Sequence, residues 1–475
     1  MNMLKQQPDK RGELKILDIE ALMPKNHLLR KIDKVVDWSK IYELTSPYYC
    51  NDNGRPSVDP VVLVKMGFIQ HLYGIPSLRR TVSEIEVNIA YRWFLHFNLD
   101  SPIPHFATVS YAFATRFPSE LFQNIFAWIL ESAVSKKLVK AETVFIDATQ
   151  IKASANKNKR RKELSQTTAR TYDERLREEI NIDREAHGKK PLKDKDDDGT
   201  PPPTKEITVS TTDPDCGLFR KGEHKVEFAY TTHVACDENN FILEADVSAG
   251  NVHDSAMFDE LYKSVLEKFP EAERVALDAG YKTPWIMKQI FDSGRLPSTP
   301  YKRPMTKDGF FKKYDYVYDE HYDCIICPNN QVLKYTTTNR DGYREYKSDP
   351  KICVSCPHLK QCTESRNHQK VVMRHIWEDY IERAEDVRHS PEGKATYGLR
   401  SQTIERVFAD AKEKHAMRYT HLRKLDRVRN WVRFKFAAMN LKKMARWVGE
   451  YDFFVRIIHG YNEKASSGVI LNWLF

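Results

Sequence analysis

Thr143-Val144-Phe145-Ile146-Asp147 is a short apolar run that ends in a carboxylate, and it predicts a buried strand of an α/β fold. A second run of the same kind, Arg274-Val275-Ala276-Leu277-Asp278, follows later in the chain. Sites in α/β sheets usually open where strands end. Asp147 and Asp278 are therefore candidate site residues.

A third acidic residue, Glu405, lies in the stretch 401–412, which predicts a helix. Lys412 follows Glu405 by seven residues, so both lie on one face of that helix, two turns apart. A metal ligand and a phosphate-binding lysine would then point to the same groove. The apolar positions expected to face the core are Ile404, Val407, Phe408 and Ala411.

Two strand carboxylates and one helix carboxylate can converge to hold a pair of divalent cations. Hard cations prefer oxygen ligands, and a pair of them can clamp both the attacking and the leaving oxygen of a phosphodiester. In the plainer interpretation, each acid is a loop or surface residue with a local salt bridge. That interpretation is the better one for a single Asp after a strand, but not for three together. We therefore predict one catalytic site formed by Asp147, Asp278 and Glu405.

The order of the predicted elements favours an α/β core with helices packed on a mixed sheet. Further strands are predicted at 226–236 and 241–247, and a helix at 254–269 precedes the Asp278 strand. Residues 1–135 are predicted to be mostly helical, with a helix start at 57–60. Their short helices and tight turns fit a helix-turn-helix or, equally well, a plain helical bundle.

Shifts in composition divide the chain further. From 157 to 205, charge runs and Pro201-Pro202-Pro203 indicate an exposed, partly disordered insertion with one charged helix near Tyr172 to Glu185. The predicted domains are a helical N-terminal DNA-binding domain (1–135), a first core part (136–300) containing the insertion 157–205, a Cys-rich insertion (301–370), a second core part with basic helices (371–450), and a C-terminal tail (451–475).

The chain has 475 residues and a formal net charge of +9. Between Lys394 and Arg446 there are 15 Lys and Arg against 4 Asp and Glu, a surplus of +11 that exceeds the whole-chain excess. Such a field beside a candidate metal site suggests a nucleic-acid partner, although a solvated helical surface is the plainer alternative. The candidate phosphate contacts are Arg406, Lys414, Arg418, Arg423 and Arg427.

No stretch approaches the ~18 uninterrupted apolar residues that span a bilayer, and the N-terminus lacks an apolar signal core. The sequence therefore predicts a cytoplasmic protein without a membrane partner.

Five of the eight cysteines cluster, as two CxxC pairs and a single residue. In a cytosolic chain this spacing indicates tetrahedral zinc more than disulfides, and thiolate ligands would supply folding energy to a small insertion. Five candidates for four ligand positions leave the set open, and reduced thiols without metal remain the alternative. The candidates are Cys324, Cys327, Cys353, Cys356 and Cys362.

Several pieces of the chain resemble the signature blocks of bacterial insertion-sequence DDE transposases, in the subgroup with a cysteine-bearing insertion before the glutamate. The resemblance covers most of the chain. One departure is that four residues separate Arg400 from Glu405, where a common form of the motif has three. The pieces are Phe145–Thr149, Leu277–Tyr281, Tyr397–Arg400 with Glu405 and Lys412, Asp213–Asp215, Asn251–Asp254, Met23–Arg30 and Arg92–Leu95.

The resemblance implies a ribonuclease-H-like catalytic core in which Asp147, Asp278 and Glu405 bind two Mg²⁺ ions, with Mn²⁺ as a substitute. Tyr397, Arg400 and Lys412 match the residues that accompany the family's glutamate and would contact DNA. In the same subgroup Cys stands before Pro, which favours Cys327, Cys353, Cys356 and Cys362 as the zinc ligands over Cys324. Trp285, after Asp278, could stack on a flipped base, but a core tryptophan is the plainer alternative.

The predicted function is that of a transposase that binds terminal inverted repeats, cuts the DNA and joins the ends to target DNA. Because two ends must be brought together, a homodimer on double-stranded DNA is expected. The alternatives are a DNA-binding protein derived from such an enzyme and a stand-alone nuclease. Three mutually repelling carboxylates argue against a pure binder.

Overall fold

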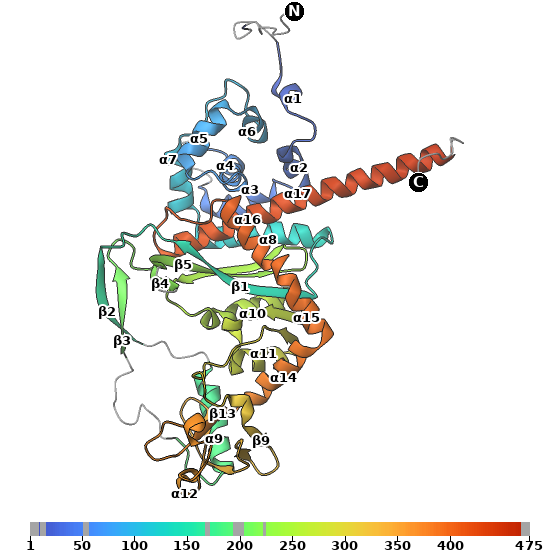
Figure 1. Ribbon diagram of the computed structural model, residues 1–475. Coiled ribbons are helices and arrows are strands. Elements are labelled where there is room, and N and C mark those ends of the chain that lie inside the picture. The colour runs from blue at the N-terminus through green and yellow to red at the C-terminus, as the bar shows by residue number, and fades with distance from the viewer. Residues whose placement is uncertain are drawn as a thin grey trace, which may run out of the picture. The chain divides into compact units, whose positions relative to one another are not determined.

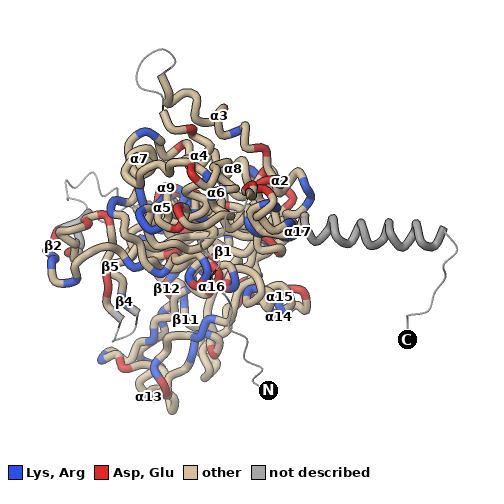
Figure 2. The backbone as a smooth tube through the Cα atoms, turned by 90° about the horizontal axis from the view of Figure 1, so that it is seen from above, with Lys and Arg blue, Asp and Glu red and all other residues tan. Residues whose placement is uncertain are grey.

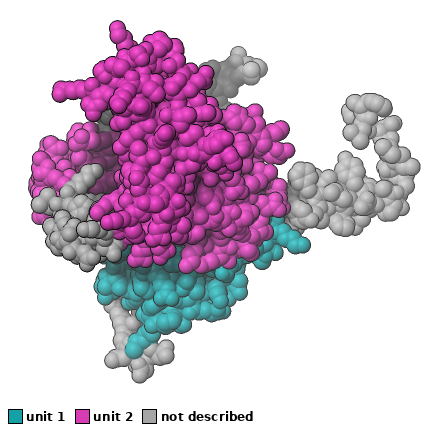
Figure 3. All heavy atoms as spheres, turned by 90° about the horizontal axis from the view of Figure 1, so that it is seen from below, with its two compact units in different colours: residues 1–139, 409–419, 426–475 teal, residues 140–408, 420–425 magenta. Residues whose placement is uncertain are grey.

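The computed structural model describes residues 9, 16–50, 57–166, 172–192, 204–221 and 225–466. The chain forms two compact units (Figure 3): unit 1 holds residues 1–139, 409–419 and 426–475, and unit 2 holds residues 140–408 and 420–425. Helices and sheets are both present, as the sequence predicts. Among the helices described, none has the length and apolar character needed to cross a bilayer.

Unit 1 is helical, and its predicted helix starts are correct. The Asp59 carboxylate accepts a hydrogen bond from the Val61 amide at the start of α4, and Ser77 caps α5 in the same way through Arg80. Its helices in the described residues are α1 (Ile19–Leu22), α2 (Leu28–Val35), α3 (Lys40–Thr45), α4 (Pro60–Leu72), α5 (Leu78–Val87), α6 (Ile89–Phe94), α7 (Phe106–Tyr111), α8 (Ser119–Ser135) and most of α17 (Leu425–Ser466).

Aromatic side chains form the core of unit 1. The Trp38 ring packs edge-on against Phe68, Phe94 and Trp128, with ring centroids 5.5–5.9 Å apart. From α17, Phe434 lies 4.6 Å from the Phe68 ring. These contacts give the described part of unit 1 the character of a helical bundle.

The contacts of α17 change the predicted domain boundaries. Residues 409–419 and 426–466 group with the helical unit and not with the core part 371–450, because the apolar side chains of α17 pack among those of the N-terminal helices. The predicted tail boundary at 451 falls inside α17 (Figure 1), while 467–475 lie outside the described residues.

A buried lysine ties three segments of unit 1 together. Lys65 is 1% exposed, and its ammonium group donates to Asp33 Oδ1 at 2.7 Å and to the Phe94 carbonyl at 3.0 Å. The same ammonium lies over the rings of Trp38 and Phe94. Burial lowers the pKa of Lys65, and the Asp33 charge opposes that shift.

Replacing Asp33 by alanine should therefore lower the free energy of unfolding by about 3–5 kcal/mol, because it leaves a buried charge without its partner. Chemical denaturation followed by circular dichroism measures the loss. Asp100→Ala, at an exposed position of the same unit, is the matched control and should stay within about 0.5 kcal/mol of the wild type. Equal stability of the two variants would contradict a role for the ion pair.

Two buried histidines of unit 1 predict acid sensitivity. The His415 Nδ1–H donates to the His71 carbonyl at 2.7 Å. Burial, more than the nearby lysine charges, lowers the pKa of His415 to about 4, and burial also lowers that of His71. Below pH 6.5 the unfolded chain therefore binds protons that the folded chain does not.

Because of this difference, the stability of unit 1 should fall as the pH drops from 6.5 towards 4. For His415 alone the loss is about 1.5 kcal/mol between pH 6.5 and 5. Denaturation curves at a series of pH values measure it, and His415→Gln should reduce the slope. An unchanged slope in that variant would assign the acid sensitivity to other groups.

Unit 2 is built on a mixed eight-stranded sheet. At its centre, β1 (Thr143–Lys152) pairs antiparallel with β5 (Lys225–Cys236) and parallel with β7 (Arg274–Leu277). Beyond these, β8 (Leu296–Ser298) is parallel to β7, and β6 (Ile242–Ala249) is antiparallel to β5. The remaining strands are β2 (Arg160–Gln166), β3 (Thr204–Ser210) and β4 (Gly217–Lys221).

Helices surround this sheet at the positions that the sequence predicts. The helix at 254–269 is a 3₁₀ turn, η4 (Asp254–Met257), followed by α10 (Phe258–Lys268). Thr283 caps α11 (Pro284–Asp292), which lies on the same side of β1 and β5 as α10 (Figure 1). After the Cys-rich insertion the chain continues through α14 (Glu378–His389), α15 (Pro391–Gly398) and α16 (Ile404–Glu413).

The Cys-rich insertion forms a second, five-stranded antiparallel sheet in the order β13-β12-β11-β10-β9. Its core comprises Tyr316, Ile325, Leu333, Tyr346 and Val372. Because β13 belongs to this sheet, the insertion extends beyond the predicted boundary at 370. Its strands are β9 (Val317–Asp319), β10 (Cys324–Ile326), β11 (Val332–Thr338), β12 (Tyr343–Lys347) and β13 (Val371–His375).

The charged insertion 157–205 is more regular than the sequence predicts. The predicted helix is present as α9 (Asp173–Ala186), but β2 and β3 also form an antiparallel ladder on the edge of the main sheet. Charged strands can form such an edge because their side chains stay in water. The charge run 193–199 and prolines 201–203 lie outside the described residues.

Helix α9 packs against the Cys-rich insertion. Arg184 donates to the Thr337 hydroxyl at 2.9 Å and to the Thr338 carbonyl at 2.6 Å. Asp183, which is buried, accepts two hydrogen bonds from Arg344 at 2.6 and 2.8 Å. Two segments that interrupt the core at different places in the sequence therefore form one body.

Candidate active site

Asp147 and Asp278 lie side by side at the centre of the main sheet. Ile146 of β1 is paired with Leu277 of β7 in a parallel register, and the two aspartates are the next residues. Neighbouring strands are about 4.8 Å apart, so the backbones at both aspartates are close. Burial is the main cause that raises the pKa of Asp147, and the charge of Asp278 raises it further.

Arg400 holds Asp147 in place. Its guanidinium lies 2.6 Å from Asp147 Oδ2 and also donates to the Ile146 carbonyl at 3.3 Å. Arg400 itself is only 4% exposed. The prediction that Arg400 contacts DNA stays a prediction; in the structure its side chain lies inside unit 2 and pairs with the carboxylate of Asp147.

Glu405 reaches the same neighbourhood from the first turn of α16, where its side chain is exposed. The charges of all three acids act on the half-buried Tyr397. Burial is the main cause that raises the pKa of Tyr397, and the charges of Asp278, Glu405 and Asp147 raise it further while Arg400 opposes them. The apolar positions of α16 are buried as predicted, namely Ile404, Val407, Phe408 and Ala411.

The donor set suits hard divalent cations, although the side chains are not gathered at ligand distance. Within the described ranges, no group of three or more His, Cys, Asp or Glu side chains has the geometry to hold a metal ion. The chemistry nevertheless fits, because carboxylate oxygens repel one another until a cation neutralises them. A buried hydroxyl beside them also lacks a partner: Tyr281 is 1% exposed, and no described group hydrogen-bonds to its Oη.

Most of the predicted DNA contacts are exposed, but several have acidic neighbours. Lys414 lies 2.6 Å from Asp410 Oδ1, Arg418 pairs with Glu413, and the Arg423 Nε donates to the Ser154 carbonyl at 3.0 Å. Figure 2 shows both basic and acidic residues on α16. Of the others, Arg406 and Arg427 are exposed and Lys412 is half-buried.

Trp285, predicted to stack on a base or to pack in the core, contacts neighbouring side chains of unit 2 in the structure. Its ring stacks on Tyr172 with centroids 4.7 Å apart, and its indole N–H lies 3.1 Å from both Asp259 carboxylate oxygens. Leu176, Ile180 and Trp377 form the small core beside it. With one face covered and its donor used, Trp285 is poorly placed to stack on a base.

Four of the five clustered cysteines line one small cavity of about 30 Å³: Cys327, Cys353, Cys356 and Cys362. The Gln331 amide donates to Cys327 Sγ at 3.4 Å. Burial raises the pKa of the Cys362 thiol, and the charges of Cys353 and Cys327 raise it further, which places these sulfurs near one another. All eight cysteines are free of disulfides.

Cys324 lies outside this cavity. It belongs to β10 and is buried, and its charged neighbours are Asp319 and Asp323, not the other thiols. The cysteine spacing could not distinguish Cys324 from the other four candidates, because its position outside the cavity follows from the pairing of β10 in the sheet.

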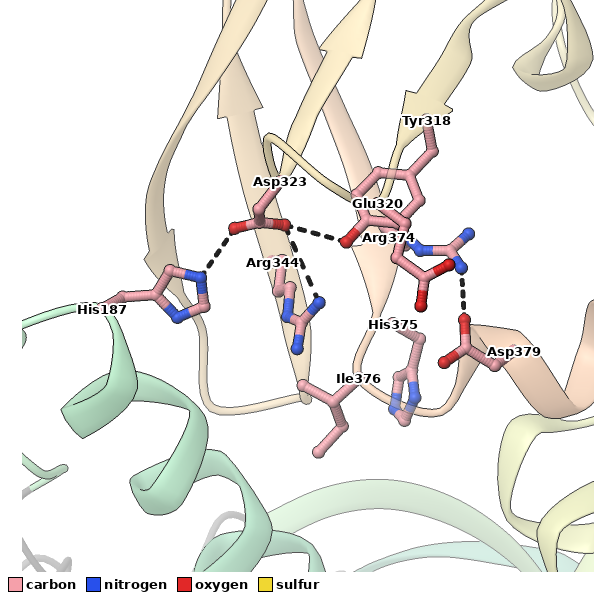
Figure 4. A pocket seen from close by; sticks show the side chains of 9 residues that line it. All are labelled: His187, Tyr318, Glu320, Asp323, Arg344, Arg374, His375, Ile376 and Asp379. Atoms are coloured by element: carbon pink, nitrogen blue, oxygen red, sulfur yellow. Dashed lines mark hydrogen bonds and ion pairs between the residues drawn. The ribbon is translucent and has the colours of Figure 1, made fainter.

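A larger cavity of about 320 Å³ opens between α9 and the insertion sheet. Figure 4 shows Asp323 joined to His187, Tyr318 and Arg344, at 2.7, 2.9 and 3.9 Å. Arg374 in turn pairs with Asp379. The arginines that line this cavity therefore already have carboxylate partners, and none of the predicted site residues lines it. We interpret it as part of the attachment of α9.

Two protein-family models match the chain. Residues 17–114 match one described as "Transposase domain (DUF772)", and residues 326–445 match one described as "Transposase DDE domain". The first match lies in helical unit 1. The second begins in β10 and includes the four cavity cysteines, Tyr397 and Glu405. No curated protein matches the chain.

Proposed function

We propose that the chain, which carries two matched transposase domains, is an insertion-sequence DDE transposase and that it cuts and joins DNA at the ends of its element. In this proposal it binds the terminal inverted repeats in the cytoplasm, at the nucleoid. The observation that carries the catalytic part is that Asp147 and Asp278 directly follow paired residues of β1 and β7, while the charges of both and of Glu405 act on Tyr397.

The arrangement of strands supports a ribonuclease-H-like core. Three antiparallel strands, β6, β5 and β1, are followed by β7 and β8, which run parallel to β1. That arrangement, with Asp147 on the central strand and Asp278 directly after its parallel neighbour, is the one expected for such a core. Glu405 would complete the site from a helix outside the sheet.

Asp147, Asp278 and Glu405 would hold two Mg²⁺ ions, or Mn²⁺ in their place. Bound there, the ions would supply a polarised phosphate and a nucleophilic oxygen, from water or a DNA 3′-hydroxyl. The chain's own residues do the positioning. Arg400 pairs with Asp147 Oδ2, the Ala148 amide donates to Asp147 Oδ1 at 2.8 Å, and the Arg400 guanidinium also lies over the ring of Tyr397.

Double-stranded DNA would be held by the basic residues of the C-terminal third. Arg406 and Arg427 are exposed, and Lys412 lies two helical turns beyond Glu405, where it suits a phosphate next to the reacting one. Lys414, Arg418 and Arg423 would exchange their protein partners for phosphates. Such contacts supply sequence-independent affinity that falls steeply with salt.

We further propose that the thiols of Cys327, Cys353, Cys356 and Cys362 bind a structural Zn²⁺. A cavity of about 30 Å³ has room for a single ion, and four thiolates suit tetrahedral zinc. The small core of the insertion, five buried residues, leaves a need for such a crosslink. We leave Cys324 out of the proposed set because it does not line this cavity.

A strand-transfer assay tests the proposed function. The full chain is incubated with Mg²⁺, a labelled transposon end and a plasmid target; joining of the label to the plasmid is expected. Cleavage without joining would favour a nuclease, and binding without cleavage would favour a DNA-binding protein. A homodimer is expected on the paired ends, and light scattering of the DNA complex measures it.

A further inference from the structure

A fourth acidic residue lies beside the predicted site. Asp254 begins η4, which contacts the short turn η5 (Ala279–Tyr281) that follows Asp278. Asp254 belongs to the stretch Asn251–Asp254, which resembles a signature block of the family, but the sequence alone predicts no role for it. Its position follows from the topology: β6 runs in the same direction as β1, so the chain leaving β6 is free to turn back towards Asp278.

The Asp254 carboxylate is half-buried and has no hydrogen-bond or ion-pair partner in the part of the chain that the structure describes. Burial is the main cause that raises the pKa of Asp254, and the charge of Asp278 adds to it while His253 opposes. The half-buried Asp254 and the exposed Asp278 repel one another, and a bound cation or a proton would relieve that repulsion.

Tyr281 gives an independent sign that something is bound there. Its hydroxyl is buried without a hydrogen-bond partner among the described residues, which ordinarily costs about 1–3 kcal/mol. The charges that act on this hydroxyl come from Asp254, Asp147 and Asp278, besides Arg400. Burial and these acids hold the pKa of Tyr281 far above its usual value, so the hydroxyl keeps its proton and can donate.

We propose that Asp254 is a fourth oxygen ligand of the divalent-cation site, on the Asp278 side, and that the Tyr281 hydroxyl orients the carboxylates around it. This inference rests on the proposed function, because it adds a ligand to the same site. Arg400 occupies one oxygen of Asp147, so the pair of cations needs another donor. Asp254 would supply it from a separate loop, the one that follows β6.

Mn²⁺ binding to the full chain, measured by titration calorimetry without DNA, tests this inference. The wild type should bind two ions, and Asp254→Asn should weaken one of them by about 10–100-fold. Asp254→Glu should recover part of the loss, and Tyr281→Phe, which keeps the buried ring, should weaken the same ion. Glu260→Gln removes an exposed charge from neighbouring α10 and should change nothing.

The outcomes separate the two proposals. If the wild type cuts DNA and Asp254→Asn, folded by circular dichroism, binds both ions as tightly as the wild type, Asp254 is not a ligand while the proposed function stands. If Asp254→Asn does not fold, Tyr281→Phe and Asp254→Glu decide the question by the same titration. A wild type that binds no Mn²⁺ overturns the inference, whereas one that binds two ions but never cuts DNA overturns the proposed function.

Discussion

Replacing Asp278 by asparagine should reduce DNA cleavage by a factor on the order of 10³ or more while end binding stays intact, because several kcal/mol of cation-derived stabilisation disappear. Asp278 is exposed beside Asp147, and its amide replacement keeps the volume and the turn that follows. Its carboxylate accepts a hydrogen bond from the Ala279 amide at 2.6 Å, which the asparagine carbonyl can also accept. Only the charge is removed.

Single-turnover cleavage of a labelled end measures the effect, and a gel-shift titration of the same DNA measures binding. Glu273→Gln is the matched control, since it removes an exposed charge just before β7. It should cut at the wild-type rate. An Asp278→Asn protein that still cuts would take Asp278 out of the site and, with it, the paired-strand geometry on which the proposal depends.

Cys356→Ser should empty the proposed zinc site and loosen the insertion. Structural zinc contributes on the order of 10–16 kcal/mol of apparent binding free energy in small domains, and the insertion has few other means of holding its two short helices, α12 (Pro350–Cys353) and α13 (Leu359–Cys362). Elemental analysis should find about one zinc per wild-type chain and far less in the variant.

Cys324→Ser is the control that the structure offers. It removes a buried thiol from the same sheet, but outside the cavity, and should leave the zinc content unchanged. Hydrogen exchange over residues 327–362 should rise in Cys356→Ser alone. A wild type without zinc would end the metal proposal, and a Cys324→Ser protein without zinc would return that residue to the ligand set.

The strands and helices of the core could be predicted from sequence because their signals are local. The apolar run up to Asp147 and the periodic apolar face around Ile404 each depend on near neighbours along the chain, although β1 continues past Asp147 to Lys152, so that Asp147 is not at the predicted strand end. The adjacency of Asp147 and Asp278 needed one more step, a parallel pairing of their strands, and the structure has it.

Other features depend on long-range packing that no local pattern carries. Arg400 looks like a surface arginine in sequence, yet the 3₁₀ turn after α15 brings it against β1, where it pairs with Asp147. The charged stretch 157–205 looks disordered because its pattern is polar throughout, but its strands gain a partner in each other and its helix gains Arg344. The proximity of Asp254 and Tyr281 also depends on long-range packing, so no local pattern predicts it.

Because α9 packs on the Cys-rich sheet, two segments that leave the core at different places in the sequence form one accessory module. Asp183 spans them, with Arg344 on the far side. A shortened variant that lacks only α9 or only the Cys-rich sheet would expose the contact surface of the segment that is left. Both segments therefore have to be removed together. The pair could equally be transplanted together into a related core without rebuilding the catalytic sheet.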